Sequence, residues 1–429
     1  MEIRTEVKQM KACAPFVASM SAESRNHALE RIACRLKEYE QEIFEENRKD
    51  LLAAEEAGIA ASVIKRLKFD AGKLEDVFKG LRQLQTLPDP VGKITLRREL
   101  DEDLILERVT CPIGVIGVIF EARPDALVQI SALCIKSGNC AVLKGGKETA
   151  NTNRILFRVI HDSLVECGFP EKSLLQAELH NEIDELLECD DCVDLLIPRG
   201  SNRFVRYIMD NTRIPVMGHS DGLCHIYVDA DADLKKVLPV IVDAKTQYTA
   251  ACNAVETLLV NRSCAPAFLP AISEELKKNH VRIRGTKEVM ELLPESGWAE
   301  ETAEEDFREY LDLIVSVKLV ADVDEAIDHI NRNGSHHTDA ILTENRETAD
   351  RFMNLVDSAG VYWNCSTRFA DGFRYGFGAE VGISTGKLHA RGPVGLEGLV
   401  TYKYRLCGNG QIVGDYAAGK REFHFRDLL

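Results

Sequence analysis

One cysteine is surrounded by residues that suit covalent chemistry. Cys252 has alanines beside it at positions 250, 251 and 254, and residues 255–260, which follow, are β-prone. Small neighbours leave room for a substrate, and a strand fixes the position of the thiol. A thiolate attacks an acyl carbon well, and the thioester that forms accepts hydride more readily than a carboxylate does. Cys252 is therefore our candidate nucleophile.

The remaining cysteines have a plainer interpretation, because cysteine is often a small buried hydrophobe. Cys264, Cys365 and Cys407 are the closest competitors among the thirteen cysteines, and none lies in a comparable segment. Cys189 and Cys192 have the C-x-x-C spacing of redox and metal sites, but no second pair lies nearby and the acids between them raise a thiol pKa. We expect all of these to be structural.

Adjacent histidines at positions 336 and 337 also suggest a metal site. Neighbouring residues do not share one face of a helix, and the segment around them resembles a turn before a strand. We expect loop structure here and no metal.

Two lysines flank a pair of glycines after the apolar run 140–143: Lys144, Gly145, Gly146 and Lys147. No G-x-G-x-x-G fingerprint is present, since the glycines at 114 and 117 lie inside an apolar run. Lysines at a helix start oppose the helix dipole, so the pattern favours an anionic guest over a pair of merely solvated side chains.

Alternating strands and helices must position these groups. The apolar runs 113–120, 140–143 and 193–197 suit strands buried on both faces, with a helical segment at 155–164 between the last two. This order predicts an α/β fold with a parallel sheet whose carboxyl edge binds the ligand. The pattern starts afresh near residue 225, with a strand at 225–228, a helix at 232–244 and then the nucleophile segment.

The first hundred residues have helical patterns. Ser21 can cap a helix whose apolar positions step by three and four from Leu29 to Ile43. Further helices are expected at 50–56 and 71–85, and the prolines at 88 and 90 end the region. Residues 104–109 and 399–404 alternate as two-faced strands do.

Composition bounds the rest. A chain of 429 residues with 45% hydrophobic content should divide into two or three parts, and a net charge of −16 argues against nucleic acid or an anionic membrane as the main partner. The odd number of cysteines without a framework spacing, the lack of a leader and the lack of a membrane-length apolar run together predict a cytoplasmic protein.

The segment 252–260 resembles the nucleophile segment of the aldehyde dehydrogenase superfamily, and in particular of its gamma-glutamyl phosphate reductase (glutamate-5-semialdehyde dehydrogenase) branch. Stretches at 65–67, 87–92, 120–125 and 381–393 resemble the same branch in the same order, so the resemblance covers essentially the whole chain. It implies two doubly wound, Rossmann-like three-layer domains and a small β arm for oligomerisation, in which 399–404 pairs with 104–109.

These considerations predict the following organisation. Residues 1–103 and 110–225, with a returning segment near 386–398, form an NADP-binding domain. Residues 226–385 form the catalytic domain, and 104–109 with 399–415 form the arm.

The resemblance also implies an activity: reduction of L-glutamyl 5-phosphate to L-glutamate 5-semialdehyde with NADPH and release of phosphate, a step of proline biosynthesis, through a thioester on Cys252. It implies that Lys144, with Gly145 beside it, contacts the adenosine ribose. Gly200 and Ser201 meet the dinucleotide at a helix start, and Glu309 holds the nicotinamide ribose. Lys147 replaces a glutamate that often binds the ribose hydroxyls, which favours NADPH over NADH.

The segment 364–369 resembles the Asn-Ala-Ser-Thr-Arg-Phe signature of the branch, with Cys365 in place of the alanine. Ser366, Thr367 and Arg368 can hold a carboxylate or a phosphate, although the same residues also suit a simple turn. Three further arginines are lower-ranked substrate candidates: Arg123, Arg199 and Arg391. Thr249 replaces a usual proline near the nucleophile.

Two groups of other superfamily members are missing. Where hydrolytic members place a glutamate that activates water, residues 215–222 contain none, which fits exchange of the thioester with phosphate. Where others place an oxyanion asparagine, this chain has residues 121–124 without an amide side chain. The backbone N–H of Cys252 remains as one oxyanion donor, and Asn253 is either the second donor or a brace for the loop.

Other functions stay open at this point. One is a CoA-acylating or hydrolytic aldehyde dehydrogenase, and another is a nucleotide-binding oligomer without catalysis. We expect a homo-oligomer, with a glutamate 5-kinase as a candidate partner.

Overall fold

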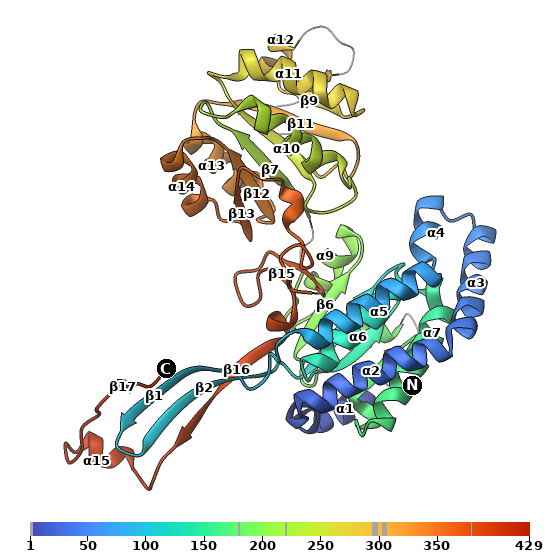
Figure 1. Cartoon of the computed structure of the whole chain (residues 1–429), viewed down its shortest axis with the longest axis vertical. Helices are drawn as coiled ribbons and strands as arrows, with labels where there is room; N and C mark the ends of the chain where they lie inside the picture. The colour runs from blue at the N-terminus through green and yellow to red at the C-terminus, as the bar shows by residue number, and fades with distance from the viewer. Residues whose placement is uncertain (1–2, 179–180, 219–220, 294–298, 303–306, 379) are drawn as a thin grey trace. The chain divides into compact units, whose positions relative to one another are not determined.

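The computed structural model describes residues 3–178, 181–218, 221–293, 299–302, 307–378 and 380–429 (Figure 1). The chain divides into two compact units, each with its own core. The first contains Met1–Met217, Phe377–Gly382 and Val394–Leu429, and the second contains Gly218–Gly376 and Ile383–Pro393. The second unit thus begins at Gly218, eight residues before the start that the sequence analysis gave it at 226.

Helices open the first unit: α1 (Ile3–Ser19), α2 (Ala22–Glu38), α3 (Glu40–Glu56), α4 (Ala61–Leu67) and α5 (Ala71–Thr86). The Ser21 hydroxyl accepts a hydrogen bond from the Ser24 N–H, which confirms the predicted cap of α2. The stepping apolar positions are buried except Tyr39, which is half-buried. They belong to two helices, because α2 ends at Glu38 and α3 begins at Glu40.

The sheet of the first unit is parallel, in the order β5 (Leu174–Ala177), β4 (Cys140–Lys144), β3 (Val115–Phe120) and β6 (Leu195–Arg199). Every residue of β3 and β4 is buried, as the apolar runs predicted. The register sets Ile119 beside both Lys144 and Pro198, so the carboxyl ends of β4, β3 and β6 share one edge. The connecting segments are α6 (Pro124–Lys136), η1 (Lys147–Thr149), α7 (Ala150–Glu166), η2 (Glu171–Ser173), α8 (Asn181–Leu187) and α9 (Asn202–Asp210).

An antiparallel arm belongs to the same unit (Figure 1). Its strand order is β16 (Val400–Cys407), β2 (Leu104–Pro112), β1 (Ile94–Asp101) and β17 (Arg426–Asp427). The two predicted strands pair with each other, but the paired residues are 400–407 and 105–112, with Lys403 opposite Val109. Residues 94–101, which were predicted to belong to the cofactor domain, form β1, which pairs with β2 in this sheet. The remaining elements of this segment are η4 (Leu396–Leu399) and α15 (Val413–Ala417).

The second unit is a three-layer sandwich around a parallel sheet. The strand order is β10 (Ala299–Glu301), β9 (Arg282–Gly285), β11 (Ile314–Val320), β8 (Val255–Asn261), β7 (Cys224–Val228), β12 (Thr338–Leu342) and β13 (Gly360–Trp363). Alternate residues face two cores: Ile226 and Leu258 pack with α10 (Leu234–Thr246) and α11 (Ala265–Lys278), whereas Tyr227 and Leu259 pack with α13 (Val323–Asn333) and α14 (Arg346–Leu355). The predicted doubly wound α/β class is confirmed.

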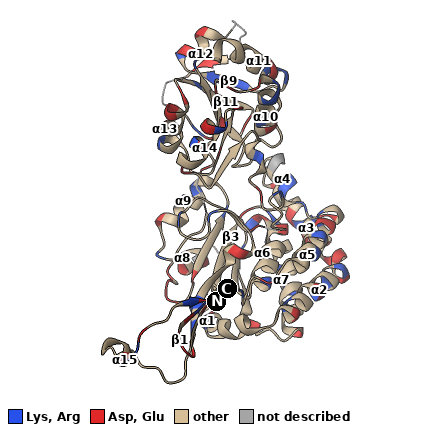
Figure 2. Cartoon of the chain, turned by 60° about the vertical axis from the view of Figure 1, so that its left-hand side comes forward, with Lys and Arg blue, Asp and Glu red and all other residues tan. Residues whose placement is uncertain are grey.

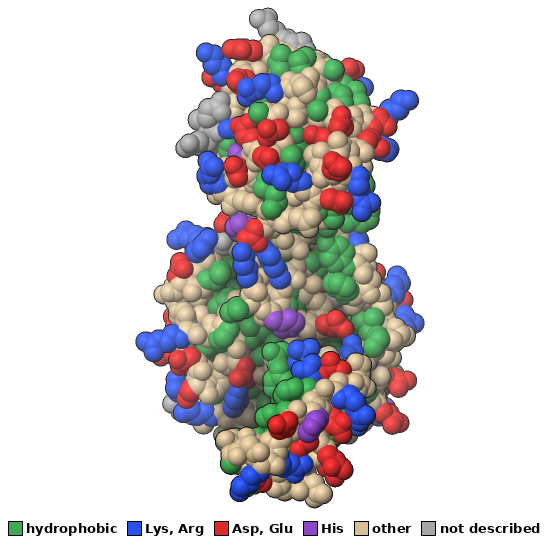
Figure 3. All heavy atoms as spheres, turned by 90° about the vertical axis from the view of Figure 1, so that its left-hand side faces the viewer, with side chains coloured by type: hydrophobic (Ala, Val, Ile, Leu, Met, Phe, Trp, Pro, Cys, Tyr) green, Lys and Arg blue, Asp and Glu red, His purple; other side chains and the backbone are tan. Residues whose placement is uncertain are grey.

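Short elements complete the described chain: α12 (Lys287–Leu292), η3 (Thr367–Phe369), β14 (Gly382–Ser384) and β15 (Gly392–Val394). Acidic and basic residues are interspersed over the helices of both units (Figure 2). Hydrophobic side chains reach the surface in small patches between them (Figure 3). Among the described residues, we find no helix whose length and apolar character would let it cross a bilayer.

Candidate active site

Cys252 lies in the loop between α10 and β8, and its side chain is partly exposed while Asn253 and Ala254 are buried. Residue 222 lies directly against the backbone of this cysteine. A Cβ at Gly222 would stand 2.2 Å from the carbonyl oxygen and 2.5 Å from the Cα of Cys252, so only glycine fits there. The backbone that carries the thiol is therefore fixed by close packing against Gly222.

His337 is the principal residue that sequence reasoning missed. Its Nε2 lies 3.1 Å from the Cys252 sulfur, and its Nδ1 lies 2.9 Å from the Thr338 hydroxyl. We expected the histidine pair at 336–337 to be loop structure, and His337 is indeed the residue before β12, but its buried imidazole contacts the nucleophile.

The order of the strands explains this contact. Cys252 shortly precedes β8 and His337 immediately precedes β12, and both strands flank β7 in parallel. Both side chains thus lie at the amino edge of one sheet, although 85 residues separate them. The only sign of this contact in the sequence was a histidine pair directly before a strand. The order of the strands in the sheet, which brings His337 to Cys252, cannot be read from the sequence.

Cys224, the first residue of β7, lies between these two groups. Its thiol donates a hydrogen bond of 3.2 Å to the Cys252 carbonyl and lies 3.8 Å from the His337 Nδ1. Burial raises the pKa of the Cys224 thiol well above its ordinary value. It therefore remains a protonated structural group beside the nucleophile.

Asn253 braces the neighbouring loop. Its side-chain amide donates to the Ala370 carbonyl at 2.8 Å, and its own carbonyl accepts from the Thr367 hydroxyl at 2.7 Å. Of the two roles left open for Asn253, the bracing contacts are the ones that the structure contains.

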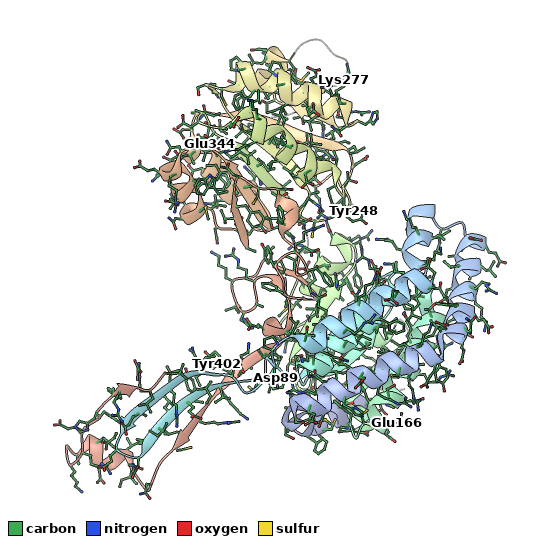
Figure 4. All side chains as sticks on the ribbon, viewed as in Figure 1. Asp89, Glu166, Tyr248, Lys277, Glu344 and Tyr402 are labelled. Carbon is green, nitrogen blue, oxygen red and sulfur yellow. The ribbon has the colours of Figure 1, made fainter. Side chains whose placement is uncertain are left out.

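The three signature residues 366–368 lie next to this brace and differ in role. Ser366 caps η3 by accepting from the Arg368 N–H, and Thr367 is fully buried with its hydroxyl on Asn253. The Arg368 guanidinium is 6.0 Å from the ring of Tyr248, which Figure 4 labels, and its Nε donates to Gln247 at 2.9 Å. Burial, with Arg374 nearby, lowers the pKa of Arg368.

Glu309 connects to the same loop through Gly222, whose N–H donates to the Glu309 carboxylate at 3.0 Å. Behind it, Lys245 and Glu256 form an ion pair of 2.7 Å in which neither side chain is exposed. The second oxygen of Glu256 accepts from the Leu311 N–H at 3.3 Å, so this pair supports the segment that carries Glu309. Burial raises the pKa of Glu256 to about 7 and lowers that of Lys245.

In the first unit, the segment 144–147 follows β4 as predicted. The Lys144 ammonium donates to the Gly145 carbonyl at 2.9 Å, and burial lowers the Lys144 pKa while nearby glutamates raise it. A Cβ at Gly145 would stand 2.1 Å from the amide nitrogen of Asn153, whose buried Oδ1 has no hydrogen-bond partner among the described residues. Lys147 is exposed at the start of η1.

Glu148, which the sequence analysis did not consider, bends back toward β3 and accepts from the Ala122 N–H at 2.7 Å.

Gly200 and Ser201 follow β6 at the start of α9. The Ser201 N–H donates to the Glu121 carboxylate at 3.0 Å, and a Cβ at Gly200 would stand 2.5 Å from that carboxylate. The carboxylate of Glu121 therefore occupies this backbone donor at the start of the helix. Arg123 is exposed at the start of α6. Of the loop 215–222, residues 219 and 220 lie outside the described part.

The predicted site residues thus form two groups. The second unit brings together Cys252, Asn253, Glu309, Ser366, Thr367 and Arg368, and the first unit brings together Lys144, Gly145, Lys147, Gly200, Ser201 and Arg123. Arg391 is held by Asp357 at 3.1 Å. Cys189 and Cys192 are buried, and burial together with the neighbouring thiol and Asp191 raises the Cys192 pKa to about 12, as expected of structural cysteines.

Known proteins share this arrangement. Residues 1–289 match the aldehyde dehydrogenase family. The chain is 54% identical to the gamma-glutamyl phosphate reductase of Pelotomaculum thermopropionicum, with 100% of this chain and 98% of the relative covered. The crystal structure of the Thermotoga maritima gamma-glutamyl phosphate reductase matches with a TM-score of 0.93 at 39% identity, covering 96% of this chain and 100% of that one.

A distant structure shares the fold alone: the glyceraldehyde-3-phosphate dehydrogenase of Methanocaldococcus jannaschii, complexed with NADP, has a TM-score of 0.61 at 16% identity over 95% of each chain. The resemblance found in the sequence is confirmed at the level of family and fold. The chain belongs to the gamma-glutamyl phosphate reductases of the aldehyde dehydrogenase family.

Proposed function

We propose that the protein reduces L-glutamyl 5-phosphate to L-glutamate 5-semialdehyde with NADPH and releases phosphate, as a step of proline biosynthesis. The observation that carries the proposal is the partly exposed thiol of Cys252 in a loop that Asn253 ties to the loop of the buried Arg368 guanidinium. A guanidinium beside a thiol recognises an anionic acyl compound and orients its carbonyl carbon toward the sulfur.

In this mechanism, the Cys252 sulfur attacks the acyl carbon, phosphate leaves, and a thioester remains on the enzyme. Arg368 holds either the phosphate or the α-carboxylate of the substrate, and Tyr248 and Gln247 keep its guanidinium in place. The Cys252 N–H is the proposed oxyanion donor. Ser366 and Thr367 shape the loop around Arg368, while Asn253 ties that loop to the nucleophile.

The residues at the carboxyl edge of the first sheet fit a dinucleotide. Gly145 and Gly200 leave no space for a side chain, and the amide of Asn153, which lies against Gly145, has a buried Oδ1 without a partner among the described residues. When bound, NADPH supplies the hydride that reduces the thioester carbon. Lys144 and Lys147 would hold its adenosine end, and Glu309 would hold its nicotinamide ribose. Gly200 and Ser201 would hold its pyrophosphate, which would replace the Glu121 carboxylate on the Ser201 N–H.

Phosphate dependence tests the function. With glutamate semialdehyde and NADP, the protein should reduce NADP only when inorganic phosphate is added, and turnover with NAD should be at least about tenfold slower. The measurement is NADPH absorbance with phosphate, with CoA, or with neither acceptor. Turnover that requires CoA would indicate an acylating aldehyde dehydrogenase, and turnover without an acceptor would indicate a hydrolytic one. NADP binding without turnover in any arm would indicate a non-catalytic nucleotide-binding protein.

Lys147 is the proposed determinant of cofactor choice. Replacing it (Lys147→Glu) places a carboxylate where a 2′-phosphate is proposed to bind, so the preference for NADP over NAD should fall by at least about tenfold, mainly through KM for NADP. Lys79→Glu, at an exposed lysine of α5, is the matched control and should leave both KM values unchanged. An unaltered preference in Lys147→Glu would show that another group reads the phosphate.

Three further expectations belong to this proposal. The free state of all thirteen cysteines supports a reducing compartment such as the cytoplasm. The position of β16 at the edge of its sheet, with the exposed Tyr402 and Tyr404 on it, supports homo-oligomerisation through the arm. A glutamate 5-kinase, as supplier of the labile acyl phosphate, is the proposed protein partner.

A further inference from the structure

The imidazole of His337 contacts the sulfur of Cys252 from the buried side. His337 has no exposed surface, whereas Cys252 is partly exposed, and the Nε2 to Sγ distance is 3.1 Å. This is within hydrogen-bond range for a sulfur and a ring nitrogen. The outer side of the sulfur stays open to a substrate while its inner side meets a base.

The position of this imidazole is fixed by the sheet. The His337 carbonyl accepts from the Gly360 N–H at 3.0 Å, and β12 pairs with β7 on one side and β13 on the other. The Thr338 hydroxyl, 2.9 Å from Nδ1, is only 1% exposed. It accepts from Nδ1–H when Nε2 receives a proton from the thiol, and it keeps that role in the imidazolium, where both ring nitrogens are donors.

The surrounding charged and titratable groups are compatible with a proton acceptor here. Cys224 is protonated because it is fully buried. Asp339 accepts from the backbone N–H of His225 at 2.7 Å and lies 2.9 Å from the His225 Nδ1. This carboxylate therefore interacts with the neighbouring histidine, His225. The His336 Nδ1 lies 2.6 Å from the Asp357 carbonyl. The Arg368 guanidinium lies on the loop that Asn253 ties to the nucleophile, and its Nε donates to Gln247 at 2.9 Å.

We propose that His337 is the proton acceptor that activates Cys252; the identity of the acyl group in the steps below rests on the proposed function. The thiol proton moves to Nε2 as the sulfur bonds to the acyl carbon. The bond from that carbon to the phosphate oxygen breaks, its electron pair leaves on the oxygen, and the imidazolium proton passes to the departing phosphate. After reduction of the thioester, the carbon–sulfur bond breaks as the aldehyde carbonyl forms, and the thiolate regains a proton from solvent through His337.

Alkylation of Cys252 tests this role without substrate or cofactor. The protein is treated with iodoacetamide between pH 5 and 10, and the rate at Cys252 is followed by peptide mass spectrometry, since only the thiolate reacts. In His337→Gln, the rate at pH 7 should fall by at least about tenfold, and the pH of the half-maximal rate should rise toward the value of about 8.5 of an ordinary thiol. The adjacent His336→Gln is the matched control and should keep the wild-type profile.

An unchanged alkylation profile in folded His337→Gln, with folding verified by thermal unfolding, would overturn the proposal and leave His337 as a packing group. If His337→Gln does not fold, Thr338→Val decides, because it keeps the imidazole and removes only its hydroxyl partner. Its profile should shift in the same direction by a smaller amount, and no shift would refute the role. The alkylation test uses neither substrate nor cofactor, whereas the proposed function is tested by phosphate-dependent turnover of the wild-type protein. Failure of the one can therefore be distinguished from failure of the other.

Discussion

Replacing the nucleophile (Cys252→Ala) should reduce turnover by roughly 10⁴-fold or more, because no other group forms the proposed thioester. Cys252→Ser should be similarly inactive, since a hydroxyl is a far poorer nucleophile than a thiolate. The measurement is NADP reduction with glutamate semialdehyde and phosphate, together with mass spectrometry of the acyl adduct in quenched wild-type enzyme. The fold should survive, because the side chain of Cys252 is partly exposed and small neighbours surround it.

Cys365 provides the matched control for this experiment. It lies beside the signature residues 366–368, burial raises its pKa, and alanine is the usual residue of the family at this position. Cys365→Ala should therefore keep near-normal activity. Appreciable turnover in Cys252→Ala, or an acyl adduct on Cys365 or Cys224 in the wild type, would refute the assignment of the nucleophile.

Much of the fold follows from local patterns. The fully apolar runs became the buried strands β3 and β4, and the helical stepping after Ser21 became α2 and the start of α3. Only part of the arm was predicted, because β1 has a single buried residue and is recognisable as a strand mainly through its pairing with β2 and β17. Pairing partners far apart in the chain are not encoded in a local period.

The site shows the same division between local and long-range information. Cys252 and the segment 366–368 could be proposed from the sequence because each has its candidate chemistry in a short stretch. His337 was not, because its role depends on the order β8–β7–β12, which places two amino-terminal strand ends together. Gly222 was also missed, since a glycine that lies against the Cys252 backbone has no distinctive neighbours in sequence.

The buried pair of Lys245 and Glu256 should dominate the stability of the second unit. Lys245→Met leaves the Glu256 carboxylate buried without its partner, and we expect a loss of about 3–5 kcal/mol in the free energy of unfolding. The double variant Lys245→Met with Glu256→Gln removes the charge, keeps an acceptor for the Leu311 N–H, and should regain most of this loss. Urea unfolding of the three proteins measures both effects.

The chain contains a matched control for burial. Lys236 and Glu344 form a pair with the same 2.7 Å separation, but their side chains are 56% and 46% exposed, and Figure 4 shows Glu344 at the surface of the second unit. Lys236→Met should therefore cost less than about 1 kcal/mol. Equal losses from Lys236→Met and Lys245→Met would contradict the burial argument.

The effect of Lys245→Met should also depend on pH. Burial raises the pKa of Glu256 to about 7 in the folded protein, and Lys245 opposes that rise, so its removal moves the pKa further up. The pKa of a glutamate in the unfolded chain is about 4.3. Between this pH and the folded pKa, Glu256 binds a proton in the folded state but not in the unfolded state. The stability that Glu256 contributes is therefore present at low pH and is lost as the pH rises through the folded pKa. The deficit of Lys245→Met relative to wild type should accordingly be smaller at pH 5.5 than at pH 8. A deficit that grows on acidification would show that Glu256 is not the buried charge responsible.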